Sequence, residues 1–249
     1  MPIAFLAGTS VGSILGAAYA SGVPLARIIH VSRNIRFRDF AKWRVSRLGL
    51  ASNERLGDLI ENFFYAQTFE ELLVPMAIVA TDLGTGEPAV FTRGPLAVAI
   101  RASCAFPGLF EPVEIGTRCL ADGGLVAPVP THAARELGAA CVVGVNVSLE
   151  DGRRINPSNL FQVVSRAVSA AQKHQLEGWE RQADLVLRPD VSAIAWDDFG
   201  RTDEAIAAGA AVARQALPRL WRMMEWTARR GERKDCEPPR KTLAMELPL

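Results

Sequence analysis

The sequence predicts an α/β fold in which a mostly parallel sheet is covered by helices on both faces. Short apolar runs alternate along the chain with alanine-rich or amphipathic segments, and this alternation is typical of successive βαβ units. Of the 249 residues, 49% are hydrophobic and 22% are charged, so the chain can bury a sizeable core. We therefore expect one substantial α/β domain.

The expected elements follow from apolar runs, glycine turns and residues that begin helices. A buried strand is expected over residues 3–7 and an alanine-rich helix over residues 14–20. Glycine turns predict strand pairs within residues 74–92 and 111–125, and β-branched runs predict strands within 139–147 and 183–189. Ser52 or Asn53, Thr68 and Thr131 are expected to cap helices, and Pro95 is expected at a first helical position. Further helices are expected from Asn159 and from Thr202, the last being interrupted at Pro218. Residues 1–229 would form the domain, and the charged, proline-bearing residues 230–249 a disordered tail.

Composition excludes several classes of protein. The net charge is +1, so no global field would attract nucleic acid. The four cysteines lie far apart and form no C-x-x-C pair, which argues against both a metal site and a disulfide framework. Glycines and small polar residues dilute the uncharged stretch before Arg27, and no basic residue begins it, so neither a signal peptide nor a membrane span is expected. These observations favour a cytoplasmic protein.

One motif near the start of the chain suggests a nucleophile. The segment from Gly8 to Gly12 reads G-x-S-x-G, with an apolar strand before it and a helix after it. Flanking glycines let the backbone turn sharply and hold Ser10 in a strained, accessible conformation. The N-terminus of the following helix would offer free N–H groups, including that of Val11, to a developing negative charge.

A serine nucleophile needs a base, and the residues leave two kinds open. Three histidines are available, of which His132 and His174 lie in expected helices, and either could complete a Ser-Asp-His triad. Asp122 is an alternative, because it ends a short expected strand and precedes Gly123 and Gly124. These glycines would permit positive φ angles and a close approach of the backbone.

Four segments carry a resemblance to a known family. They read GTSVGSILGAAYASG, ATDLGTGEPAVFTRGPL, RASCAFPGLFEPV and LADGGLVAPVPTHAARELGA. In this order the chain resembles the bacterial patatin-like phospholipases, over roughly residues 3–215. The resemblance implies a three-layer α/β/α fold, a catalytic dyad of Ser10 and Asp122, a lipid acyl ester as substrate, and no metal or organic cofactor. The matching residues Arg101, Ser103, Pro107 and Phe110 are interpreted as scaffold near the site.

The resemblance is incomplete at the start of the chain. The family normally has a strand and a glycine-rich loop before the nucleophile, and this chain begins on the strand that leads into Ser10. We therefore expect a fold without that strand and loop, in which Val11 N–H is the one evident oxyanion donor. Loss of one donor typically lowers the rate by about 10² to 10³. An alternative function is thus a truncated, non-catalytic member that binds lipid or regulates another protein.

A basic segment with interleaved aromatic residues suggests contact with a membrane. Residues 33–47 carry six arginine or lysine residues with Phe37, Phe40 and Trp43 among them. Aromatic and cationic side chains of this kind can contact anionic lipid headgroups at the inner face of a membrane. The alternative is a solvated cap over the active site. No recognition motif for nucleic acid accompanies the charge.

Overall fold

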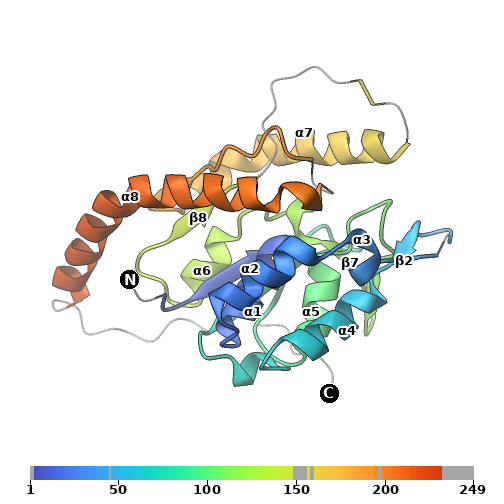
Figure 1. The fold of residues 1–249 in the computed structure, drawn as a ribbon, viewed down its shortest axis with the longest axis horizontal. Helices are drawn as coiled ribbons and strands as arrows, with labels where there is room; N and C mark the ends of the chain where they lie inside the picture. Colours follow the sequence, from blue (N-terminus) through green and yellow to red (C-terminus); the bar gives the residue numbers. More distant parts are fainter. Residues whose placement is uncertain (1–2, 45, 148–155, 158–159, 196–197, 232–249) are drawn as a thin grey trace.

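The computed structural model describes residues 3–44, 46–147, 156–157, 160–195 and 198–231 (Figure 1). Five strands form the central sheet: β1 (Leu6–Thr9), β4 (Met76–Asp82), β5 (Pro88–Phe91), β6 (Val113–Ile115) and β7 (Arg118–Asp122). The α/β class predicted from the sequence is confirmed.

Strand β4 organises this sheet. All seven of its residues are buried, as expected of an apolar strand that is covered on both faces. Ile78 and Val79 pair with both β1 and β5, so these two strands lie on opposite sides of β4. Ala80 and Thr81 pair with both β5 and β7, so β7 also lies opposite β5. Strands β1 and β7 therefore follow one another along the same side of β4.

The sheet is more mixed than the predicted, mostly parallel arrangement. Strand β1 pairs with β4 in parallel, and a separate two-stranded sheet pairs β8 (Val143–Val145) with β9 (Leu185–Leu187) in parallel. Strands β5 and β7 run antiparallel to β4, and β6 runs antiparallel to β7. The β4–β5 and β6–β7 connections are short turns, and such turns join only antiparallel strands.

Helices cover both faces of the central sheet. Helices α1 (Val11–Ala20), α4 (Glu54–Phe63) and α5 (Leu96–Ser103) share one core with Met76, Ile78 and Ala80 of β4. Helix α6 (Thr131–Glu136) packs on the opposite face through Ala133, against Ala77 and Val79. This alternation along β4 produces the predicted three layers.

The remaining elements surround these layers. They are α2 (Leu25–Asn34), α3 (Phe37–Phe40), β2 (Lys42–Trp43), β3 (Ala51–Ser52), η1 (Phe69–Glu71), η2 (Gly123–Leu125), α7 (Leu160–Glu180), η3 (Phe199–Arg201) and α8 (Thr202–Gly231). Figure 1 shows α7 and α8 running along one side of the molecule, with β2 at its margin. Among the described residues, no helix is both long and apolar enough to cross a membrane.

Three expected helix boundaries are wrong. Pro95 is the N-cap of α5 instead of its first residue. Thr131 is the first residue of α6 instead of its cap, because its hydroxyl donates to the Trp179 carbonyl at 2.8 Å and ties α6 to α7. Pro218 lies inside α8 without ending it, and Figure 1 shows this helix bending along its length. A proline removes one hydrogen bond and can be accommodated as a bend. Helix α8 continues to Gly231, and residues 232–249 of the expected tail lie outside the described residues.

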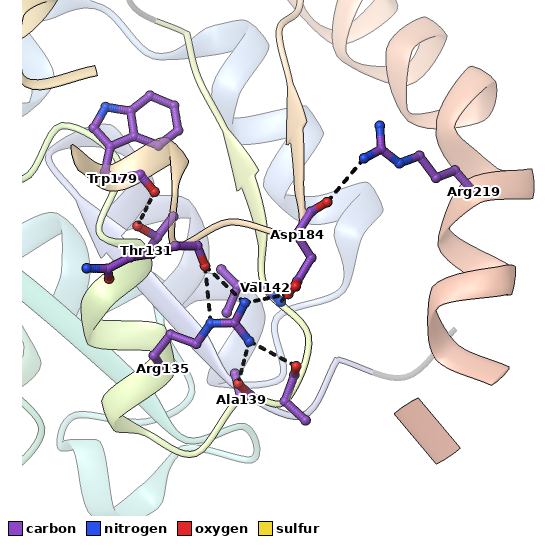
Figure 2. Close-up of polar contacts among 9 residues, drawn as sticks. Thr131, Arg135, Ala139, Val142, Trp179, Asp184 and Arg219 are labelled. Atoms are coloured by element: carbon purple, nitrogen blue, oxygen red, sulfur yellow. Dashed lines mark hydrogen bonds and ion pairs between the residues drawn. The ribbon is translucent and has the colours of Figure 1, made fainter. Parts of the chain in front are cut away.

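Arg135 joins the β8–β9 sheet to its neighbours (Figure 2). Its guanidinium donates to the carbonyl oxygens of Ala139, Ala140 and Gln182 and to the Asp184 carboxylate. The same carboxylate accepts from the Val142 N–H at 2.7 Å, immediately before β8. One arginine therefore satisfies carbonyl groups at the ends of α6 and α7 and positions the start of both strands.

Candidate active site

The register of the sheet brings the two candidate catalytic residues together. Strand β1 ends at Thr9, opposite Val79, and β7 ends at Asp122, opposite Ala80. Since both strands lie on the same side of β4 and run in opposite directions, their C-terminal ends meet there. Ser10 follows directly on β1, and its side chain lies close enough to the Asp122 carboxylate to lower the pKa of that carboxyl. Two residues 112 positions apart by their numbers thus form one cluster.

Ser10 occupies a strained turn between β1 and α1. Its φ of 51° and ψ of −125° make it the one non-glycine residue with positive φ in the described part of the chain. Such a conformation costs about 1–3 kcal/mol and persists where the surroundings hold it. Here the Ser10 N–H donates to the Ser103 hydroxyl at 2.9 Å, and the Ser13 hydroxyl donates to the Ser10 carbonyl at 2.6 Å. The side chains of Ser103 and Ser13 therefore bind the N–H and the carbonyl of Ser10.

The two glycines of the motif meet different steric conditions. A Cβ on Gly8 would lie 2.5 Å from the Gly12 carbonyl oxygen and 2.7 Å from the Ser13 Cα. These backbone atoms belong to the first turn of α1 and cannot yield without moving the elbow. A Cβ on Gly12 would meet nothing within 4 Å. Of the two positions, only position 8 requires glycine to avoid a steric clash.

We expect Gly8→Ala to lower the melting temperature by about 5 °C or more, because the new methyl displaces the elbow. The matched change Gly12→Ala is expected to leave the melting temperature unchanged or to raise it slightly, since alanine favours a helix over glycine. Thermal unfolding of both variants tests this pair. Equal destabilisation by the two changes would contradict the steric difference.

Asp122 is buried and held from several sides. Its side chain accepts from the Gly124 N–H at 2.7 Å. Its backbone N–H donates to the Ala105 carbonyl at 2.9 Å, and its carbonyl accepts from the Thr81 hydroxyl at 2.8 Å. With the backbone fixed at both ends, the carboxylate is positioned beside Ser10 before any substrate arrives.

Burial also sets the charge states of the cluster. Removal from water raises the pKa of Asp122 to about 6, against the opposing hydrogen bonds from Gly124 and Ser10. Burial, and the nearby Asp122 carboxylate, raise the pKa of the Cys104 thiol well above its usual range, although hydrogen bonds to Ser13 and Ser10 oppose the shift. At neutral pH the aspartate is therefore available as a base, whereas Cys104 stays a neutral, weakly nucleophilic thiol.

The N-terminus of α1 supplies positive potential next to Ser10. Helix α1 contains no acidic residue in its first turn, and its first N–H groups have no partner four residues earlier. Val11, the predicted oxyanion donor, is the first residue of this helix and is 51% exposed. Its N–H is thus located where negative charge next to Ser10 would be stabilised.

The glycines after Asp122 serve close packing and do not adopt positive φ angles, which corrects one expectation. Neither Gly123 nor Gly124 is among the described residues with positive φ. A Cβ on Gly123 would lie 2.1 Å from the Val79 carbonyl oxygen and 3.0 Å from a Thr9 methyl. The contact is this tight because the ends of β1 and β7 meet at the same point of β4. Gly124 donates to Asp122 and accepts from the Gln172 side chain at 2.8 Å.

Described histidine side chains lie away from the cluster. His132 pairs with Glu136 on α6 at 3.2 Å, with its own side chain 69% exposed. His30 is exposed on α2. The third histidine, His174, belongs to α7, and its side chain lies outside the described part.

Sequence reasoning missed the residues that hold the elbow. Ser103 is fully buried and receives the Ser10 N–H while donating to the Val79 carbonyl at 2.6 Å. It had been interpreted only as scaffold near the site. Ser13 and Cys104 complete the same cluster at a 3.8 Å contact between their side chains. A buried serine at the end of an alanine-rich helix, within RASCAFPGLF, was the available signal.

Comparison with known proteins identifies the family. The family model described as patatin-like phospholipase matches residues 2–135, which include the elbow and the Asp122 turn. The chain belongs to the patatin-like phospholipase family. This patatin-like chain is 34% identical over 156 residues to an uncharacterized NTE family protein of Mycobacterium tuberculosis, covering 61% of the chain and 41% of that relative. A second uncharacterized NTE family protein of M. tuberculosis is 28% identical over 240 residues, with 84% and 40% coverage.

A vertebrate relative carries the family name as well. Patatin-like phospholipase domain-containing protein 7 of Rattus norvegicus is 25% identical over 248 residues, covering 84% of the chain and 18% of the relative. The chain therefore spans less than half the length of the curated relatives described here. The family assignment supports a lipid ester hydrolase class and lipid substrates for this fold.

Proposed function

We propose that residues 1–229 form a lipid acyl ester hydrolase with a Ser10–Asp122 dyad. The observation that carries the proposal is that the ends of β1 and β7 place Ser10, in its strained elbow, beside the buried Asp122 carboxylate. Asp122 accepts the hydroxyl proton as Ser10 Oγ attacks the ester carbonyl carbon, and then gives that proton to the departing alcohol. Water then attacks the acyl carbonyl carbon as Asp122 accepts its proton, and the bond from Ser10 Oγ to that carbon breaks. Asp122 gives the proton to Ser10 Oγ, which releases the fatty acid and restores the free enzyme. The positions of the described histidines favour a dyad over a Ser-Asp-His triad.

A serine-directed fluorophosphonate probe tests this proposal. We expect the probe to label the chain, with the modified peptide containing Ser10, because the dyad makes this hydroxyl nucleophilic. Labelling should disappear in Ser10→Ala and fall strongly in Asp122→Asn. Ser169→Ala, a change at an exposed residue of α7, serves as the matched serine control and should label normally. A folded chain that is not labelled would overturn the hydrolase and favour a lipid-binding role.

A further inference from the structure

The segment from Lys42 to Ser52 forms a hairpin at the margin of the molecule. Strands β2 and β3 pair antiparallel, with Trp43 opposite Ala51. Arg44 N–H extends the ladder by donating to the Leu50 carbonyl at 3.1 Å. At the tip, the Ser46 hydroxyl accepts from the N–H groups of Leu48 and Gly49. The hairpin therefore has its own hydrogen-bonded framework.

One strand of this hairpin is fixed to the body of the protein. Leu50 and Ala51 donate to the Leu109 carbonyl at 3.0 and 2.8 Å, and Glu111 N–H donates back to Ala51. Gly49 approaches so closely that a Cβ would lie 2.6 Å from the Glu111 nitrogen. Because this strand is anchored, the other strand and the tip are held outward, and Figure 1 shows β2 at the margin.

The outward side combines cations with apolar side chains. Trp43 is 68% exposed and Leu48 is 65% exposed. Lys42, Arg44 and Arg47 are exposed beside them, and none of the three has an ion-pair partner among the described residues. The sequence contains no acidic residue from Lys42 to Asn53. Exposed tryptophan and leucine next to unpaired cations are chemically complementary to an anionic lipid surface.

The first half of the basic segment is engaged within the protein. Arg33 pairs with Asp203 at 2.7 Å, and Arg36 donates to the carbonyl groups of Asn34 and Ile35. Phe37 and Phe40 pack against each other, and Phe37 stacks on Phe110. One side of the Trp43 ring lies against Phe37, with ring centroids 5.5 Å apart, and Arg38 remains exposed. The exposed part of residues 33–47 is therefore Arg38 together with the hairpin.

We propose that the Lys42–Ser52 hairpin docks this protein on an anionic membrane. The aromatic ring and Leu48 enter the interfacial region, and the three cations contact the acidic headgroups. The hairpin is tied to the candidate active site through residues 105–109, since the Ala105 carbonyl accepts from Asp122 N–H and the Leu109 carbonyl accepts from Leu50 and Ala51. Docking would thus bring the Ser10–Asp122 cluster near the lipid. The docking proposal does not depend on whether this cluster is catalytic.

Vesicle sedimentation tests the proposal, using the full chain with Ser10→Ala so that no lipid is hydrolysed. We expect binding to phosphatidylcholine vesicles that contain about one-third phosphatidylserine, weakening as salt is added. Each cation near such a surface contributes about a fivefold factor, so changing Lys42, Arg44 and Arg47 to glutamine should lower the partition coefficient about 100-fold. Trp43→Ala should lower it about tenfold.

Two matched controls separate this surface from general charge and hydrophobicity. Changing Lys173, Arg214 and Arg222, exposed residues of α7 and α8, to glutamine removes the same charge and should change binding less than about threefold, because the hairpin stays intact. Trp221→Ala removes another exposed tryptophan and should have little effect. Absence of vesicle binding at low salt, or equal losses in control and hairpin variants, would overturn the proposal. So would a concentration-dependent dimer that Trp43→Ala abolishes while vesicles bind nothing.

Discussion

Ser10→Ala and Asp122→Asn are each expected to lower kcat/KM for a short p-nitrophenyl ester by about 10⁴-fold or more. In the proposed mechanism, the first change removes the nucleophile and the second removes the base that accepts its proton. Neither change should unfold the protein. Ser10 already carries a Cβ at its φ of 51°, so alanine adds no backbone strain. Asparagine at position 122 can still accept from the Gly124 N–H.

The double variant should be no slower than either single variant. Both residues take part in the same proton transfer, so either change alone already abolishes it. The second change then has no further effect on the rate. Steady-state kinetics of the four proteins, with His132→Ala as the control at an exposed histidine, measures this. Retained activity in Asp122→Asn, together with loss in His132→Ala or His174→Ala, would instead establish a triad.

The second large expected effect is the pH dependence of kcat/KM, because Asp122 must be ionised to act as the proposed base. The pKa of Asp122 is about 6, so kcat/KM should rise with pH through about 6 and be level above it. An ordinary aspartate would give the same rise near pH 4. A profile measured on the p-nitrophenyl ester that is already level at pH 5 would contradict the role assigned to the buried carboxylate.

The raised pKa of Asp122 also makes the stability of the fold depend on pH. The direction of this dependence is opposite to that caused by an aspartate in an ion pair. The folded-state pKa of about 6 exceeds the usual 3.8, so the folded protein binds more protons between these values, and its stability falls as pH rises from about 4 to 6. A shift of about two units corresponds to about 3 kcal/mol at pH 7. Asp122→Asn is therefore expected to stabilise the fold by about 1–3 kcal/mol at pH 7.5 and by about a third as much at pH 4.5.

Urea unfolding at the two pH values measures this difference. Asp58→Asn, a change at an exposed aspartate of α4, is the control and should shift neither midpoint appreciably. An inactive Asp122→Asn variant that is less stable than the parent at pH 7.5 would show that the carboxylate's hydrogen bonds outweigh its burial.

The sequence alone determined the local features of the protein. The apolar run before Gly8 and the glycines around Ser10 predicted a strand, a sharp turn and a helix, because backbone conformation depends mainly on neighbouring residues. The glycine turns within residues 74–92 and 111–125 predicted both hairpins for the same reason. Such local patterns also indicate Ser10 and Asp122 as candidate site residues, but they carry no information on the distance between the two.

Tertiary structure decided what these features do together. The meeting of β1 and β7 along one side of β4 depends on strand pairing between distant segments, and register of this kind is fixed by packing and not by local propensity. The same non-local contacts made Ser103 the acceptor of the Ser10 N–H. They also pair Arg33 with Asp203, whereas Trp43 and its neighbouring cations remain exposed. Which groups are buried, paired or free is a property of the folded chain, because burial and pairing depend on residues far apart in the sequence.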